Sequence, residues 1–126
     1  VVPRTQLPHI LREITRIGQK YDVRIANVFH AGDGNIHPIV LFDERNAGQV
    51  RRALAASNEI LDECIRVGGS VTGEHGIGVE KIAQMPLLFS PDDLLAMTKL
   101  RAVFDPEGRA NPHKIFPDAK VCVEAL

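Results

Sequence analysis

Residues 23–42, VRIANVFHAGDGNIHPIVLF, decide the fold of this chain of 126 residues. Residues 23–29 and residues 36–42 are both rich in β-branched and apolar side chains, which favours two strands. Between them, residues 31–35 form a cluster of turn-forming residues, AGDGN, so the stretch predicts a β-hairpin. Because the second strand is apolar on both faces apart from His37, we expect it to be central and covered.

Helical periodicity flanks the hairpin on both sides. Apolar residues at spacings of three and four predict an amphipathic helix over residues 5–20, in which Pro8 is tolerated because it lies in the first turn. The same spacing predicts a second helix over residues 47–67. Two glycines end this helix, since glycine adopts the left-handed conformation without a side-chain penalty. Residues 70–72 are expected to form a short strand.

The C-terminal part of the chain is expected to be helical. Residues 81–88 are predicted to hold a short helix. Residues 90–93, SPDD, predict the start of a longer helix that ends near Phe104. A hydroxyl cap, a proline in the first turn and acidic residues near the positive end of the helix dipole all favour a helix N-terminus there.

The predicted order is helix, strand, strand, helix, short strand, helix. One further strand before Val1 would complete β-α-β-β-α-β, the ferredoxin-like plait, and Val1-Val2 fit the end of such a strand. We therefore expect an α+β fold, a truncated ferredoxin-like plait followed by a C-terminal helical segment. The plait's antiparallel sheet would carry its helices on one face. Residues 1–78 would form the partial plait and residues 79–126 a helical tail. Since the chain does not begin with methionine, we expect a piece of a longer protein.

Composition excludes several classes of function. Fifteen basic residues against sixteen acidic ones give a formal charge of −1, which leaves no electrostatic footprint for nucleic acid or an anionic membrane. No apolar run approaches the roughly 18–20 residues of a membrane span. Two cysteines, Cys64 and Cys122, are too few for a disulfide framework and favour a reducing compartment.

Two histidines flank the predicted turn. His30 ends the first strand and His37 begins the second, so their imidazoles can be neighbours across the hairpin and share one metal ion. Asp33 lies between them as a possible further oxygen donor. Taken alone, such a pair is more often structural, with the Asp-Gly step serving as ordinary turn chemistry.

A second cluster, residues 73–78 with the sequence GEHGIG, places Glu74 beside His75 in a glycine-rich bend. Adjacent residues on an irregular loop can point in different directions, so that one binds a metal while its neighbour faces a substrate. A glutamate would complete a His-His-carboxylate set with coordination positions left open. A glycine-rich helix start, with Glu74 complementing the helix dipole, explains the same residues, and both interpretations stay open here.

The tail after the last predicted helix is rich in turn formers. Residues 105–108 are DPEG and residues 111–114 are NPHK. Proline fixes such a segment in an extended path. These residues either only end the helix and turn the chain, or form a surface that docks on something outside this chain. Composition does not distinguish the two interpretations.

Three blocks taken together resemble a known family. They are residues 27–38 (NVFHAGDGNIHP), residues 70–78 with Glu80-Lys81 (SVTGEHGIG, EK), and residues 104–108 followed by Asn111-Pro112 (FDPEG, NP). Their order and spacing resemble the C-terminal part of FAD-linked oxidases of the vanillyl-alcohol oxidase / p-cresol methylhydroxylase superfamily. The branch resembled most is the flavin subunit of bacterial glycolate oxidases, with D-lactate and D-2-hydroxyglutarate dehydrogenases as relatives. The joint occurrence of HAGDGNIH and GEHGIG is far more specific than either block alone.

The resemblance implies a flavin enzyme that oxidises glycolate, or a similar small 2-hydroxy acid, to the 2-oxo acid. In metal-dependent relatives the positions matching His30, His37 and Glu74 bind a divalent metal, and zinc, manganese and iron all accept such ligands. The position matching His75 is the proposed base, and the one matching Asn111 lies near the flavin. The family's usual Asn-Pro-Gly-Lys carries His113 in place of glycine here.

This implied chemistry is physically consistent. A bound metal can hold the carboxylate and hydroxyl oxygens of the substrate and lower the pKa of the hydroxyl. His75 would then remove the hydroxyl proton while the α-hydrogen leaves as hydride to the flavin. General-base assistance of this kind accelerates a reaction by roughly 10²–10⁴-fold.

The resemblance also implies partners. In the family an FAD-binding domain precedes this segment, so we expect the chain alone to lack FAD and to be inactive. The tail would pack on that domain or on a second copy of the chain, and other glycolate oxidase subunits are further candidate partners. We expect a cytoplasmic location, with association with the inner face of the membrane only through such subunits. The rival functions are D-lactate or D-2-hydroxyglutarate dehydrogenase and, in another class, a non-catalytic binding or assembly module with structural histidines.

Overall fold

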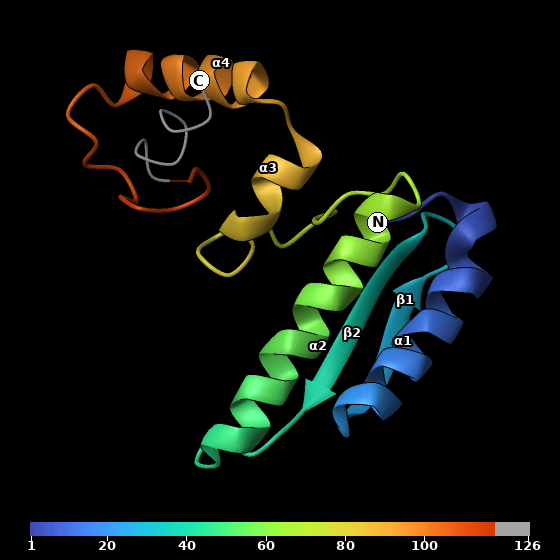
Figure 1. Ribbon diagram of the computed structural model, residues 1–126. Helices are drawn as coiled ribbons and strands as arrows, with labels where there is room; N and C mark the ends of the chain where they lie inside the picture. The colour runs from blue at the N-terminus through green and yellow to red at the C-terminus, as the bar shows by residue number, and fades with distance from the viewer. Residues whose placement is uncertain (118–126) are drawn as a thin grey trace. The chain divides into compact units, whose positions relative to one another are not determined.

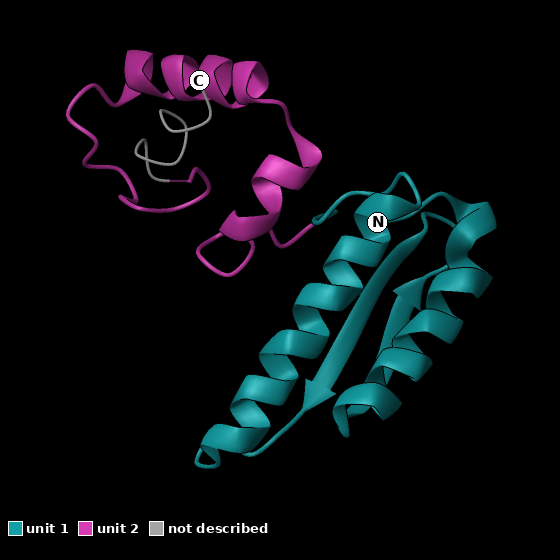
Figure 2. Cartoon of the chain, in the orientation of Figure 1, with its two compact units in different colours: residues 1–73 teal, residues 74–126 magenta. Residues whose placement is uncertain are grey.

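The computed structural model describes residues 1–117, so Cys122 and the end of the predicted tail lie outside the described residues. The chain divides into two compact units, which we call unit 1 (residues 1–73) and unit 2 (residues 74–126) and describe each by itself (Figure 2). No helix in the described part of the chain is both long enough and apolar enough to cross a membrane.

Unit 1 is a two-stranded antiparallel sheet with two helices on one face (Figure 1). Its elements are the 3-10 turn η1 (Arg4–Gln6), helix α1 (Leu7–Tyr21), strands β1 (Arg24–His30) and β2 (Asn35–Leu41), and helix α2 (Ala47–Arg66). Each predicted helix and strand of the hairpin region is found within two residues of its expected bounds. The expected α+β class, with an antiparallel sheet and helices on one face, is confirmed.

An apolar core holds the helices to the sheet. It comprises Val2, Leu7, Ile10, Ile14, Ile17, Ala56, Ile60 and Cys64. The spacing of three and four between the α1 members puts them on one stripe of the helix, as the periodicity predicted. Ile25 of β1 and Ile36 of β2 pack against this cluster, so one face of the sheet is directed toward the helices.

The prediction that residues 36–42 form a covered central strand is wrong for the described residues. β2 pairs with β1 alone, and Ile39 and Leu41 are about half exposed. Successive side chains in a strand point to opposite faces, so these two lie on the face opposite Ile36. The helices supply a covering layer on one side only, which leaves the apolar residues of the other side in contact with solvent.

The short strand predicted over residues 70–72 is not formed. Instead, Ser70 and Val1 exchange two backbone hydrogen bonds of 3.0 and 2.7 Å, and the Val2 N–H donates to the Gly34 carbonyl at 2.9 Å. Two residues that exchange both bonds form an antiparallel pair, but a single pair is too short to count as a ladder. Val1 and Val2 therefore link the segment after α2 to Gly34, the residue before β2.

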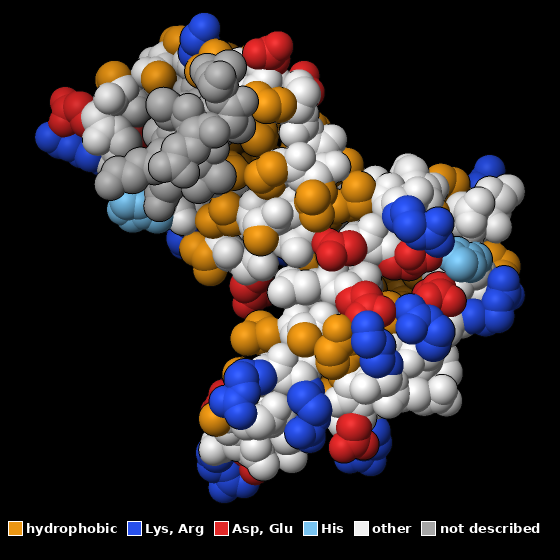
Figure 3. All heavy atoms as spheres, viewed as in Figure 1, with side chains coloured by type: hydrophobic (Ala, Val, Ile, Leu, Met, Phe, Trp, Pro, Cys, Tyr) orange, Lys and Arg blue, Asp and Glu red, His pale blue; other side chains and the backbone are white. Residues whose placement is uncertain are grey.

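Unit 2 contains the 3-10 turn η2 (Ile82–Gln84) and helices α3 (Met85–Leu88) and α4 (Pro91–Phe104). The short helix predicted over residues 81–88 is thus a 3-10 turn followed by one α-helical turn. The predicted start of α4 is confirmed as a capping box: the Asp93 N–H donates to the Ser90 hydroxyl, and the Ser90 N–H donates to the Asp93 carboxylate. Leu94 is the buried residue of α4, and Figure 3 shows many hydrophobic side chains at the surface of this unit.

Candidate metal centre

The β-hairpin brings His30 and His37 together. The strand register pairs His30 with Asn35 and His37 with Val28, so the two histidines occupy diagonal positions on the same face. Their ring centroids lie 5.4 Å apart and the ring planes are perpendicular. The turn between them is closed by the Asp33 N–H, which donates to the His30 carbonyl at 3.0 Å.

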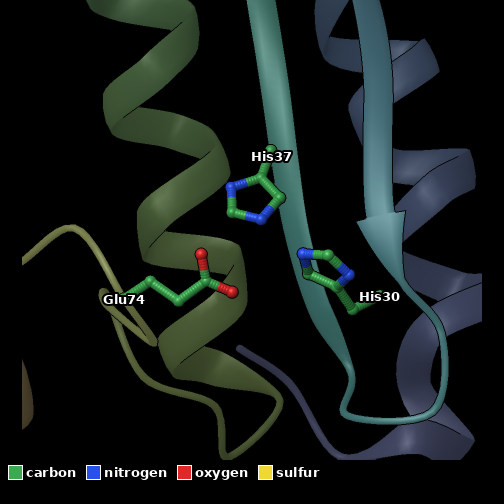
Figure 4. A group of neighbouring side chains, drawn as sticks. All are labelled: His30, His37 and Glu74. Atoms are coloured by element: carbon green, nitrogen blue, oxygen red, sulfur yellow. The ribbon is translucent and has the colours of Figure 1, made fainter.

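Glu74 completes the group because the chain before it is fixed against the hairpin. It follows Gly73, where an added Cβ would stand 3.2 Å from Oδ1 of Asn35, the residue opposite His30. Figure 4 shows the Glu74 side chain extending toward the two imidazoles. One nitrogen of each histidine and one carboxylate oxygen of Glu74 lie within 4.8 Å of one another.

Two imidazole nitrogens and one carboxylate oxygen are a donor set suited to zinc, manganese or iron. Ligand atoms on one such ion lie within about 4 Å of each other, because each bond is about 2 Å long. Small side-chain adjustments would therefore close the observed arrangement around an ion. His30 and Glu74 are exposed and His37 is half-buried, so a bound ion would keep open positions for a substrate. Asp33 is not a member of this group among the described residues.

His75 lies next to the candidate metal ligand Glu74. Its Nε2 is 3.9 Å from the Glu74 carboxylate, and its side chain is 73% exposed. The glycine-rich bend that carries both residues is held by Lys81, whose ammonium donates to the Gly76 carbonyl at 3.3 Å. The His75 imidazole is therefore exposed to solvent beside the donor set.

Asn111 lies in unit 2, in a tail segment organised by Arg101. The Arg101 guanidinium donates to the backbone carbonyls of Ala110, Asn111 and Lys114 at 2.5, 3.1 and 3.3 Å. Asn111 also lines a largely apolar groove of about 510 Å³ between α4 and the tail. The structure thus brings His30, His37 and Glu74 together and places Asn111 at a separate feature within unit 2.

His113 stands where the resemblance to FAD-linked oxidases implies a glycine. His113 has φ +58°, in the left-handed region that glycine adopts without steric penalty. A residue with a Cβ is strained there by roughly 1–2 kcal/mol. His113 therefore has a backbone conformation that favours glycine.

Sequence reasoning missed two apolar neighbours of the histidines, Val28 and Ile39. Val28 is the direct cross-strand partner of His37, and Ile39 is two residues after it on the same face. The signal that would have found them is the period of two along a strand, counted outward from His30 and His37.

The chain matches one protein family over most of its length. The family model for FAD linked oxidases, C-terminal domain, matches residues 1–115. The chain belongs to this family. It is 49% identical to glycolate oxidase subunit GlcD of Escherichia coli (strain K12) over 98% of its length. It is 36% identical to D-2-hydroxyglutarate dehydrogenase of Stutzerimonas stutzeri (strain A1501) over 88%, and 30% identical to D-lactate dehydrogenase of Archaeoglobus fulgidus over 90%. The chain spans 25% of the length of each of these relatives.

Proposed function

We propose that this chain is the substrate- and metal-binding part of a flavin-dependent 2-hydroxy-acid oxidoreductase. The reaction is oxidation of glycolate, or of a similar small 2-hydroxy acid, to the 2-oxo acid. The observation that carries the proposal is the convergence of the His30, His37 and Glu74 donor atoms within 4.8 Å. It is supported by the relatives, whose names include a glycolate oxidase subunit, a D-lactate dehydrogenase and a D-2-hydroxyglutarate dehydrogenase.

In this proposal His30, His37 and Glu74 hold one divalent cation. The cation supplies Lewis acidity toward the carboxylate and hydroxyl oxygens of the substrate, which orients the acid and makes its hydroxyl easier to deprotonate. Both histidines must be neutral to act as ligands, so metal affinity weakens at acidic pH.

His75 acts as the general base. Its imidazole accepts the proton of the substrate hydroxyl, while the electron pair of that O–H bond forms the carbonyl of the 2-oxo acid. The hydrogen on C2 departs as hydride, and FAD supplies the acceptor for it when bound. In this scheme Asn111 contacts the flavin. The chain matches the family's C-terminal domain and a quarter of its relatives' length, so we assign FAD binding to a domain outside residues 1–126.

The test uses the full-length protein that carries this chain, purified with its flavin. Glycolate and D-lactate are mixed with it separately without oxygen, and reduction of the flavin is followed by its absorbance. We expect at least one of them to reduce the flavin rapidly. Failure of both acids would overturn the assignment to these substrates.

Variants separate the two proposed roles. Glu74→Gln should lose most of the bound metal in elemental analysis, whereas Glu44→Gln, an exposed acid outside the site, should retain it. His75→Asn should retain the metal and lower turnover by at least about 100-fold, as expected for loss of a general base. Near-normal turnover of His75→Asn would remove it from that role.

A further inference from the structure

The histidines lie on the face of the hairpin that the helices do not cover. Ile25 and Ile36 point toward the core, and side chains alternate along a strand, so the register identifies the residues of the opposite face. It carries Arg24, Ala26, Val28 and His30 of β1 with Asn35, His37, Ile39 and Leu41 of β2. Asn35 lies opposite His30 at the turn end of this face, and on the side of His37 away from the turn the face is apolar as far as Ala26 and Ile39.

Val28 and Ile39 are the nearest apolar side chains to His37 on this face. Val28 is directly opposite His37, which puts their Cβ atoms about 4.5–5.5 Å apart. Ile39 follows His37 by two residues, roughly 7 Å along the strand. Val28 is 54% exposed, so its methyl groups are accessible to a small molecule held at the histidines.

The charged residue of this face is distant from the histidines. Arg24 lies four residues from Val28, roughly 13 Å along β1. In a five-carbon dicarboxylic 2-hydroxy acid the second carboxylate is only three carbon–carbon bonds from C2. Against Val28 and Ile39 that carboxylate would lose water without gaining a partner, which is unfavourable.

We propose that Val28 and Ile39 form the wall that receives the carbon substituent of the substrate. The wall selects monocarboxylic 2-hydroxy acids whose substituent is hydrogen or a short alkyl group. This inference rests on the proposed function, because it needs the substrate's oxygens to be held at His30, His37 and Glu74. It makes Val28 and Ile39 specificity-determining residues that take no part in the chemistry.

The experiment compares substrates that differ only in the alkyl group. In the full-length protein with its flavin and metal, kcat/KM is measured for glycolate and D-2-hydroxybutyrate. Glycolate has no alkyl substituent and is therefore the internal reference. Val28→Ala should lower kcat/KM for D-2-hydroxybutyrate relative to kcat/KM for glycolate. The expected decrease is about 4-fold for each methylene group of the substrate that the smaller side chain no longer buries.

Leu41→Ala is the matched control. Leu41 lies on the same face with a similar exposure of 48%, but it is four residues beyond His37. In Leu41→Ala the ratio of kcat/KM for D-2-hydroxybutyrate to kcat/KM for glycolate should equal that of the wild type. As a complementary variant, Val28→Arg should raise kcat/KM for D-2-hydroxyglutarate relative to glycolate, whereas Leu41→Arg should not.

The outcomes distinguish the two proposals. If the wild type oxidises glycolate but Val28→Ala and Leu41→Ala change the kcat/KM ratio equally, the proposed role of Val28 and Ile39 is wrong, whereas the proposed function stands. The wall is also wrong if the wild type prefers D-2-hydroxyglutarate to both monocarboxylic acids. If the wild type oxidises no 2-hydroxy acid, the proposed function fails and the wall fails with it.

Discussion

At the scale of single residues, Gly34 determines the turn that brings the two histidines together. Its φ is +70°, and an added Cβ would overlap the carbonyl oxygen of Val2. We expect Gly34→Ala to lower the free energy of unfolding by about 2–3 kcal/mol. About 1–2 kcal/mol of this comes from the left-handed backbone and the rest from displacement of Val2. Urea denaturation of the protein measures the change.

Gly32 provides the control in the same turn. An added Cβ there meets no atom within 4 Å. We expect Gly32→Ala to change the free energy of unfolding by no more than about 0.5 kcal/mol, as for most surface substitutions. Equal losses for the two variants would show that the turn as a whole, rather than the contact of Gly34 with Val2, sets the effect.

At the scale of elements, an ion-pair cluster joins α1 to α2. Glu63 of α2 accepts hydrogen bonds from Arg66 at 2.5 Å, and it lies 2.7 Å from Nε2 of His9 on α1. The Arg66 guanidinium, with a smaller contribution from His9, lowers the pKa of Glu63 from 4.5 to about 2. His9 is half-buried in this contact between the two helices.

Removing this carboxylate should destabilise the helix pair in a pH-dependent manner. We expect Glu63→Gln to lower the free energy of unfolding by about 1–2 kcal/mol at neutral pH, the range for hydrogen bonds to charged groups that are not fully buried. The pKa of Glu63 is lower in the folded state, so its contribution is present above pH 4.5 and is lost as pH falls toward 2. Denaturation of wild type and variant at several pH values measures the difference.

Glu13→Gln is the matched control for Glu63. Glu13 hydrogen-bonds Arg16 three residues away on the same helix and interacts with α2 only through the charge of Arg66, so its loss breaks no hydrogen bond between α1 and α2. We expect a change below about 0.5 kcal/mol, as for an exposed pair within one helix. A difference between wild type and Glu63→Gln that persists undiminished at pH 2 would contradict the ionic origin of the effect.

The same elements show what sequence can predict about this fold. The bounds of α1, β1, β2 and α2 follow from periodicity and turn formers, because both are local properties. The His9–Glu63 contact spans 54 residues and leaves no local pattern, so it was not predictable. The wrong prediction that β2 is a covered central strand has a related cause. An apolar face indicates that some surface should pack on it, but the sequence of the strand does not indicate which element that is.

At the scale of the whole molecule, the candidate site was predictable in part. The facing histidines follow from a hairpin, whose register places His30 and His37 on one face. The approach of Glu74 does not follow from any pattern. It depends on the path of residues 67–73 after the end of α2 and on the packing of Gly73 against Asn35. The residues alone left that approach as one of two open interpretations, and the resemblance to a family, which combines blocks far apart in the chain, is what favoured it.

The chain also exposes an apolar stripe on α4. Leu100, Val103 and Phe104 lie at spacings of three and four and are between 63% and 83% exposed. Contiguous apolar surface of this kind promotes association in water. We expect the isolated chain of 126 residues to self-associate, which analytical ultracentrifugation would measure as an average mass that rises with concentration.

Phe104→Glu should shift the chain toward monomer, because a charge in the stripe must be desolvated on association. Leu54→Glu is the control, since Leu54 on α2 is 60% exposed but lies outside the stripe, and it should leave the association unchanged. If both variants weaken association equally, the effect comes from net charge rather than from α4. Fusion to the proposed FAD-binding domain should suppress association of the unmodified chain if that domain covers the stripe. Association that persists in the fusion would instead assign the stripe to contacts between copies of the chain.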